Sequence, residues 1–274
     1  MAYDLTSIKT TAAEHPPRVL IYGPPGLGKT SLAAEFPNPV IMDIEDGVPS
    51  GVEIPSLGEI TSYQSVLDRF AALYNGDHTF KTLIIDSLDR LEPLIWAHAC
   101  TENNWASIED AGYGKGYIVA ADLWSKFIAS CNLLRTKRGM NIVFIGHSTI
   151  DRFDDPQNEP YSRYDIRLHK RANAIIQDEC DAIIFVNMDV AVKTEDIGFN
   201  KSVSRAEGGS FRWLHCEGRP AFTAKNRFGM PERIKYDKGQ GYAQIAPFLP
   251  CQDVAKPKTK GAAKAKPETM KEAA

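Results

Sequence analysis

Long hydrophobic runs are missing from this sequence: no stretch approaches the about 18 consecutive apolar residues of a membrane-spanning helix. Cysteine is scarce, with five residues and no C-x-x-C pair, which excludes a disulfide framework and favours reduced thiols in a cytosol. The N-terminus has no basic stretch followed by an apolar run, so no secretory signal is predicted. Apolar residues make up 43% and charged residues 24%, which is typical of a folded globular protein. We therefore expect a cytoplasmic protein without membrane contact.

Over most of the chain, basic residues are fewer than acidic ones. The net charge of the 274 residues is −3, yet residues 252–274 hold six lysines against three acidic side chains, so the rest is more acidic still. A uniformly basic nucleic-acid binder is thereby excluded, and any such contact must come from local patches or from the tail. We predict a polar leader over residues 1–16, one domain over 17–250 and a disordered Lys-rich tail over 251–274.

Short apolar runs alternate with helical patterns along the chain. This alternation predicts an α/β fold with a mainly parallel central sheet flanked by helices. After about residue 189 the runs become shorter and alternate in polarity, which predicts an antiparallel C-terminal extension. The expected strands are 18–22, 40–43, 82–86, 141–146 and 182–186, and the expected helices are 29–36, 62–75, 88–103, 117–137 and 168–179.

A glycine-rich turn joins the first predicted strand to the first helix. It reads Gly23-Pro24-Pro25-Gly26-Leu27-Gly28-Lys29-Thr30 and matches the G-x-x-x-x-G-K-[ST] pattern in full. Backbone N–H groups of such a loop surround phosphate oxygens, and the following helix adds its dipole, so residues through Ser31 are predicted to bind a nucleotide. Lys29 is expected at the β- and γ-phosphates, and the hydroxyl of Thr30 is expected to ligate Mg²⁺.

Acidic side chains follow two other predicted strands. Asp86 ends the run Leu83-Ile-Ile-Asp86, where a Walker B carboxylate holds Mg²⁺; the alternative is a helix cap. The residue after it is Ser87 and not a glutamate, so the candidate general base is Glu45 at the end of the second strand, with Asp43 and Asp46 as alternatives. Because parallel strands bring their carboxyl ends together, these residues are expected to share one site.

The order of these motifs resembles that of the RecA-like ATPase core. The motifs are the glycine-rich turn at residues 23–30 (Walker A), the acidic IMDIED segment, the Walker B segment IIDS and the strand IVFIGH. The resemblance is nearest to phage RecA-core nucleotide-binding and single-strand annealing proteins. It implies ATP and Mg²⁺ as cofactors, Glu45 as the catalytic glutamate and His147 as the sensor of the γ-phosphate. It also implies that Lys225 and Arg227 reach the ATP of a neighbouring protomer.

The same resemblance implies two DNA-facing segments. The first lies around residues 112–117, where glycines give mobility and the tyrosines can stack on bases; its predicted DNA contacts are Tyr113, Lys115 and Tyr117. The second begins at Ser148 and runs to about Arg171. Cations for phosphates interleaved with aromatic rings for bases are typical of single-strand binding, although acidic residues share the second segment. The predicted contacts in it are Arg163, Tyr164, Arg167, Lys170 and Arg171.

The sequence thus predicts a Mg²⁺-dependent ATPase that binds single-stranded DNA in phage-type recombination. Partners would be a homo-oligomeric ring or filament and a single-strand-DNA-binding protein, in the cytosol of a bacterial host if the gene is a phage gene. Three alternatives stay open. They are an AAA+-type remodeller or helicase loader, which would need a helical lid after the core; a nucleotide-switched binding module; and a P-loop small-molecule kinase.

Overall fold

The computed structural model describes residues 15–196 and 202–252. Residues 1–14 of the predicted leader and 253–274 of the predicted tail lie outside this part of the chain. The described fold reaches Gln252, whose side-chain amide donates to the Asn141 side chain over 2.9 Å, so it extends slightly past the expected boundary at 250.

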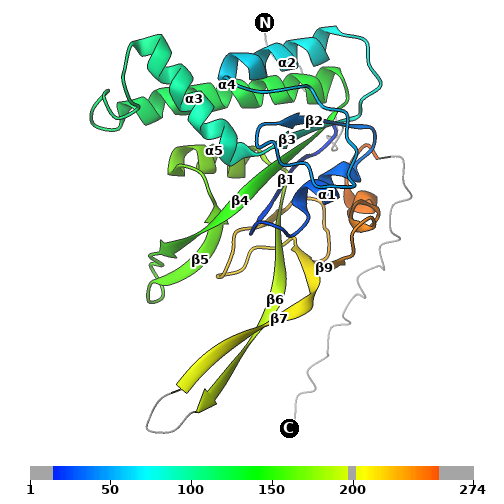
Figure 1. The fold of residues 1–274 in the computed structure, drawn as a ribbon, viewed down its shortest axis with the longest axis vertical. Helices are drawn as coiled ribbons and strands as arrows, with labels where there is room; N and C mark the ends of the chain where they lie inside the picture. Colours follow the sequence, from blue (N-terminus) through cyan, green and yellow to red (C-terminus); the bar gives the residue numbers. More distant parts are fainter. Residues whose placement is uncertain (1–14, 197–201, 253–274) are drawn as a thin grey trace, which may run out of the picture.

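The centre of the molecule is one mixed sheet of nine strands, counted over the described residues (Figure 1). Neighbouring strands follow the order β2-β3-β4-β1-β6-β7-β9, with β5 paired to β4 and β8 paired to β6. The parallel part consists of β1 (Arg18–Gly23), β2 (Pro39–Asp43), β3 (Thr82–Asp86), β4 (Asn141–Phe153) and β6 (Ala182–Asp196). The antiparallel part consists of β5 (Tyr161–Ile166), β7 (Ser202–His215), β8 (Lys225–Asn226) and β9 (Arg233–Tyr236).

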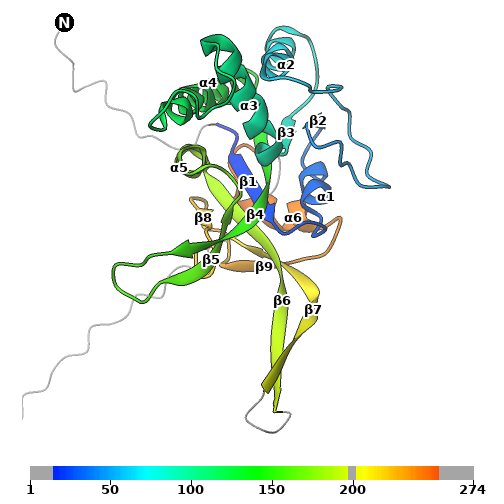
Figure 2. The ribbon, with the colours of Figure 1, turned by 60° about the vertical axis from the view of Figure 1, so that its left-hand side comes forward.

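Helices cover both faces of the sheet, as Figure 2 shows. Side chains alternate along each parallel strand, so that in β1 Leu20 and Tyr22 face one apolar layer while Val19 and Ile21 face the other. Burial on both faces explains why these strands are nearly continuous apolar runs. The first layer holds α2 (Tyr63–Asn75), α3 (Leu88–Asn103), α4 (Lys115–Lys137) and α5 (Lys170–Glu179). The second holds α1 (Lys29–Ala34), α6 (Gly241–Ile245) and the 3-10 helix η2 (Ala246–Phe248).

Local signals in the sequence set several element ends. The α2 helix begins after Ser62, whose side chain accepts a hydrogen bond from the backbone N–H of Ser65 over 3.1 Å. The Ser65 hydroxyl in turn accepts a hydrogen bond from the backbone N–H of Ser62 over 3.2 Å. This capping box satisfies N–H groups that the helix leaves free. Among the described residues, no helix combines the length and the apolar character needed to cross a membrane.

Two strands, β4 and β6, run further than the sequence predicts, and each continues into a hairpin. The second predicted DNA loop is in its first part a hairpin, because β4 continues to Phe153 and pairs in antiparallel register with β5, from Ser148 opposite Ile166 to Phe153 opposite Tyr161. The expected strand 182–186 is likewise only the start of β6, which pairs with β7 into a two-stranded ribbon that projects from the body (Figure 1). Beyond the parallel core, β4 and β6 continue as polar alternating segments. Pairing of β4 with β5 and of β6 with β7 supplies their backbone hydrogen bonds.

Candidate nucleotide site

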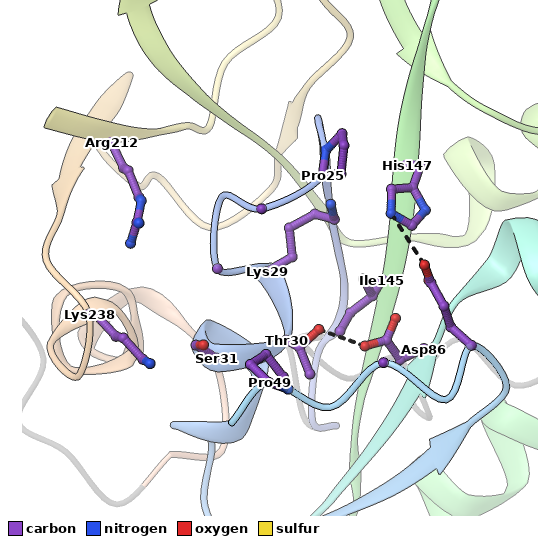
Figure 3. Close-up of a pocket in the computed structure, with 14 residues that line it drawn as sticks. Pro25, Lys29, Thr30, Ser31, Pro49, Asp86, Ile145, His147, Arg212 and Lys238 are labelled. Carbon is purple, nitrogen blue, oxygen red and sulfur yellow. Dashed lines mark hydrogen bonds and ion pairs between the residues drawn. The ribbon is translucent and has the colours of Figure 1, made fainter. Parts of the chain in front are cut away.

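The carboxyl ends of four neighbouring strands meet at one edge of the sheet. In register, Gly23 of β1 lies opposite His147 of β4, and Asp43 of β2 lies opposite Asp86 of β3. Ligands of open α/β sheets bind beyond such carboxyl ends. A pocket of about 410 Å³ lies here, and its lining combines the glycine-rich turn with Glu45, Asp86 and His147 (Figure 3).

The glycine-rich turn has the backbone shape that its residues predict. Gly26 and Gly28 adopt φ values of 77° and 85°, a left-handed conformation that glycine adopts without steric cost. Lys29 begins α1 and is 6% exposed, and its ammonium donates to the backbone carbonyls of Gly23 and Pro24 over 3.1 and 3.0 Å. Burial lowers the pKa of this lysine. A buried ammonium with only carbonyl partners is therefore suited to receive phosphate oxygens.

Two oxygen groups lie where a magnesium ion is predicted. The hydroxyl of Thr30 donates to Oδ2 of Asp86 over 2.7 Å (Figure 3). Burial raises the pKa of Asp86 to about 6, with the nearby Glu45 adding to the rise. Within the described residues no group of three or more His, Cys, Asp or Glu side chains could hold a metal ion. This donor set fits Mg²⁺, which is commonly held by one or two protein oxygens together with nucleotide phosphates and water.

Glu45 and His147 lie next to each other in the pocket lining. Oε1 of Glu45 lies 3.7 Å from Nε2 of His147, and Glu45 lines the pocket with its backbone N–H donating to the Asp86 carbonyl over 3.2 Å. The two alternatives to Glu45 lie elsewhere, since Asp43 and Asp46 line a separate hollow. Of the three acidic residues, only Glu45 thus lines the pocket that the glycine-rich turn also lines.

An aspartate that the sequence analysis missed holds His147 in place. Asp89 of α3 accepts a hydrogen bond from the backbone N–H of His147 over 3.1 Å and lies 3.1 Å from its Nδ1 through both carboxylate oxygens. Arg167 also donates to Asp89, over 2.5 Å. Although burial opposes it, these partners keep the pKa of Asp89 below its ordinary value. A carboxylate on Nδ1 fixes the imidazole ring so that Nε2 faces Glu45.

Arg167 is therefore tied to the nucleotide pocket and not only to the predicted DNA surface. Its backbone N–H donates to the His147 carbonyl over 2.9 Å, in addition to the ion pair with Asp89. Arg163 has different surroundings: its guanidinium lies 4.1 Å from the Phe153 ring and 3.4 Å from Asp165. The two arginines thus belong to different local structures, although they are four residues apart.

Of the predicted DNA contacts, those at two helix starts come together. Tyr117 of α4 stacks on His169, the residue before α5, with ring centroids 4.2 Å apart and planes at 10°. The exposed side chains of Lys115, Lys170 and Arg171 begin these same helices. Tyr113 is fully exposed beside the start of α4. His169 was missed because a single histidine carries no sequence signal.

Tyr164, by contrast, is packed against the apolar core. Its ring lies 5.2 Å from that of Phe185. The backbone of Tyr164 bonds to the 221–223 segment, with its N–H donating to Ala221 and its carbonyl accepting from Thr223. Its predicted role as a base-stacking ring is unsupported by this position.

The cations predicted to act in a neighbouring protomer lie far from their own pocket. β8 pairs with the start of β6, at the edge of the sheet where the parallel strands begin. There the Lys225 ammonium donates to the carbonyls of Gln177 and Asp178 at the end of α5, and Arg227 lies 3.3 Å from Asp181. A role across an interface stays a prediction for both residues.

Two other cations line the pocket and were not predicted. Arg212 of β7 and Lys238, which follows β9, lie on the far side of the glycine-rich turn from His147 (Figure 3). No motif marks them, because Arg212 reaches the pocket through the pairing of β7 with β9 and Lys238 through the contacts of its turn with Glu35.

Comparison with known proteins gives a family match over most of the chain. The profile of a family described as an AAA domain (AAA_24) matches residues 15–228. Among solved structures, the chain is similar to the RadB recombinase, with 14% identity and a TM-score of 0.43 over 82% of this chain and 90% of that one. The comparison with curated proteins finds no match. The predicted fold class, a mainly parallel P-loop core with an antiparallel C-terminal extension, is confirmed.

Proposed function

The chain belongs to the AAA-domain family, and on that premise we propose that it is a Mg²⁺-dependent ATPase that binds single-stranded DNA and acts in phage-type recombination or single-strand annealing. The observation that carries the proposal is a continuous set of contacts. It runs from the nucleotide pocket through Glu45 and His147 to Asp89 and Arg167 at the base of the β4–β5 hairpin.

The residues that the motifs predict for the pocket have roles in hydrolysis that their positions support. Lys29 and the turn bind the phosphates, and Thr30 with Asp86 would hold the magnesium ion, which supplies charge neutralisation between phosphates. Glu45 is positioned to accept a proton from an attacking water. His147, held by Asp89 at Nδ1, presents Nε2 toward Glu45 and the pocket.

The DNA-binding part of the proposal is supported by where two separate segments converge. The Tyr117–His169 stack joins the start of α4 to the start of α5, and three exposed cations, Lys115, Lys170 and Arg171, begin these helices. Aromatic rings and cations together bind single strands without sequence preference. Arg167 links this surface to the pocket through Asp89.

Among the alternatives, an AAA+ remodeller with a helical lid is not supported by the region after the core. There the described residues form β7, β8 and β9 with the short helices α6 and η2. A homo-oligomer is the proposed assembly, with Lys225 and Arg227 as the candidates for contacts across its interface.

The test is ATP turnover by the purified full chain with and without single-stranded DNA. We expect Mg²⁺-dependent turnover that DNA stimulates, and its loss in Lys29→Ala. Asn132→Ala serves as a control for general damage, because Asn132 lies in α4 and accepts a hydrogen bond from Arg18 at the start of β1, away from the pocket. Turnover that DNA leaves unchanged would favour the kinase or switch alternatives, and normal turnover by Lys29→Ala would contradict the assignment of the pocket.

A further inference from the structure

The nucleotide pocket carries more positive charge than its sequence motif supplies. Arg212 and Lys238 line it in addition to Lys29, and neither has a hydrogen bond or an ion pair to any described residue. The guanidinium of Arg212 lies beside the glycine-rich turn: a Cβ placed on Gly28 would be 3.6 Å from its Nη1. Two cations without an acidic partner among the described residues therefore face a pocket that is proposed to bind a nucleotide.

The positions of both cations are fixed by contacts between the C-terminal strands and α1. The Tyr236 hydroxyl lies 3.5 Å from the carbonyl of Gly28 and 3.3 Å from the Glu35 carboxylate, at the end of α1. Glu35 also accepts hydrogen bonds from the backbone N–H groups of Gly239 and Tyr242, over 2.7 and 2.8 Å. The turn that carries Lys238 is thus held on α1, next to the phosphate-binding loop.

Strand register places Arg212 on the same side. Arg212 pairs with Tyr236 across β7 and β9, so both side chains point to the α1 face of the sheet. The neighbouring Trp213 and Lys235 pair on the opposite face. Because side chains alternate along a strand, Arg212 of β7 points to the pocket, while Lys235 of β9 points to the opposite face of the sheet.

The pocket has two ends with different chemistry. Thr30, Asp86, Glu45 and His147 lie at one end, where magnesium and the γ-phosphate are expected. Arg212 lies across the loop from them, and Lys238 lies next to Ser31 (Figure 3). A nucleotide that places its γ-phosphate at the acidic end directs its α-phosphate and ribose toward the two cations.

Charge balance supports the same assignment. Apart from these two residues, the pocket lining holds one cation, Lys29, against two carboxylates, Glu45 and Asp86. Such a lining is unfavourable for a polyanion before magnesium binds. Arg212 and Lys238 reverse the sign.

We propose that Arg212 and Lys238 are nucleotide-binding residues that act within one chain, contacting the α-phosphate and ribose end of the bound nucleotide. This inference rests on the proposed function of the pocket as an ATP site. It differs from the predicted role of Lys225 and Arg227, which would act on a neighbour's γ-phosphate. Because the α-phosphate and ribose occur in both ATP and ADP, the two cations would bind both nucleotides.

The experiment measures dissociation constants of the full chain for Mg²⁺-ATP and Mg²⁺-ADP by calorimetry. The variants are Arg212→Ala, Arg212→Lys and Lys238→Ala, with Lys235→Ala as the matched control from the other face of β9. We expect Arg212→Ala to weaken ATP and ADP by the same factor, about tenfold to a hundredfold for a charge-assisted contact. Arg212→Lys should recover part of this loss, Lys238→Ala should lose less because its side chain is exposed, and Lys235→Ala should bind as wild type does.

The outcomes separate the inference from the function on which it rests. Wild-type affinity in both Arg212→Ala and Lys238→Ala, while Lys29→Ala no longer binds, overturns the inference and leaves the ATP site in place. A loss confined to ATP overturns it too, because the contact would then be to the γ-phosphate. If the wild type itself binds neither nucleotide, the proposed function fails. Should Arg212→Ala unfold, Lys238→Ala on the exposed turn gives the same comparison.

Discussion

Replacing Asp89 by asparagine tests the contacts that link the nucleotide pocket to the base of the β4–β5 hairpin. The change preserves size but removes the charge that His147 and Arg167 share. The asparagine side chain has only one acceptor oxygen, so it cannot accept from both His147 Nδ1 and the Arg167 guanidinium. Its NH₂ group therefore faces one of these two donors. The backbone N–H of His147 can keep its acceptor.

The expected magnitude follows from the exposure of each partner. The Asp89 side chain is 5% exposed and that of His147 13%, so their charge-assisted contact counts in full, at about 1.5–3 kcal/mol. The Arg167 side chain is 53% exposed, so its ion pair adds at most about 1 kcal/mol. We therefore expect the free energy of unfolding to fall by about 2–4 kcal/mol, which lowers the melting temperature by about 5–15 °C for a domain of this size.

The loss should depend on pH in a defined direction. Because the folded protein holds the pKa of Asp89 below its ordinary value, the carboxylate contributes stability above that ordinary value and loses it as pH falls through the folded pKa. The difference between wild type and Asp89→Asn should be full at pH 7 and should shrink under acid conditions. Thermal unfolding across this range measures it, with the exposed Asp122→Asn of α4 as control.

ATP turnover provides the second measurement on Asp89→Asn. With the ring of His147 free to rotate, we expect kcat to fall about tenfold to a hundredfold, as for other partners that orient a histidine. ATP affinity should change little, because Asp89 does not line the pocket. Normal stability together with normal turnover would refute the reasoning.

Three further predictions concern neighbouring groups. Glu45→Gln should bind ATP as wild type does and lose turnover, since an amide cannot accept the proton of water; retained turnover would show that another base acts. Arg163→Ala should weaken DNA binding and lower its salt dependence by about 0.7 log units per decade, and ATP turnover without DNA should stay unchanged. Arg167→Ala should reduce ATP turnover without DNA, because Arg167 contacts Asp89. The same turnover without DNA in both variants would contradict the different surroundings of the two arginines. Burial raises the pKa of Glu92 to about 7, so wild-type stability should fall as pH rises from about 4.5 to 7, by up to about 3 kcal/mol, and Glu92→Gln should flatten that slope in thermal melts.

The parallel core could be predicted from the sequence because burial on both faces leaves a visible trace. Strands such as β3 are apolar from Leu83 to Ile85, directly before Asp86, and Ser62 marks a helix start through its own side chain. The glycine-rich turn is equally visible, since its chemistry depends on consecutive residues. In each of these elements, the residues that determine the structure are neighbours in the sequence, so the pattern is visible without the fold.

The β4–β5 hairpin could not be predicted in the same way. β5 contains Arg163 and Asp165 among its six residues, and polar strands of this kind look like loop in the sequence. Their pairing partner, the end of β4, is 63% exposed at Ile150 and is equally ambiguous. Asp89 was missed for a related reason: an acidic residue in the first turn of a helix is common, and its contact with His147 requires α3 and β4 to be placed together.

The two ends of the nucleotide pocket therefore differ in how sequence specifies them. The acidic end, with Asp86 and Glu45, comes from parallel strands whose order and register bring motif residues together. The cationic end depends on antiparallel pairing of β7 with β9 and on the Glu35 contacts that dock the following turn on α1. Because separate parts of the fold build the two ends, we expect substitutions at Arg212 to alter nucleotide affinity without altering the groups that are proposed to act on the γ-phosphate.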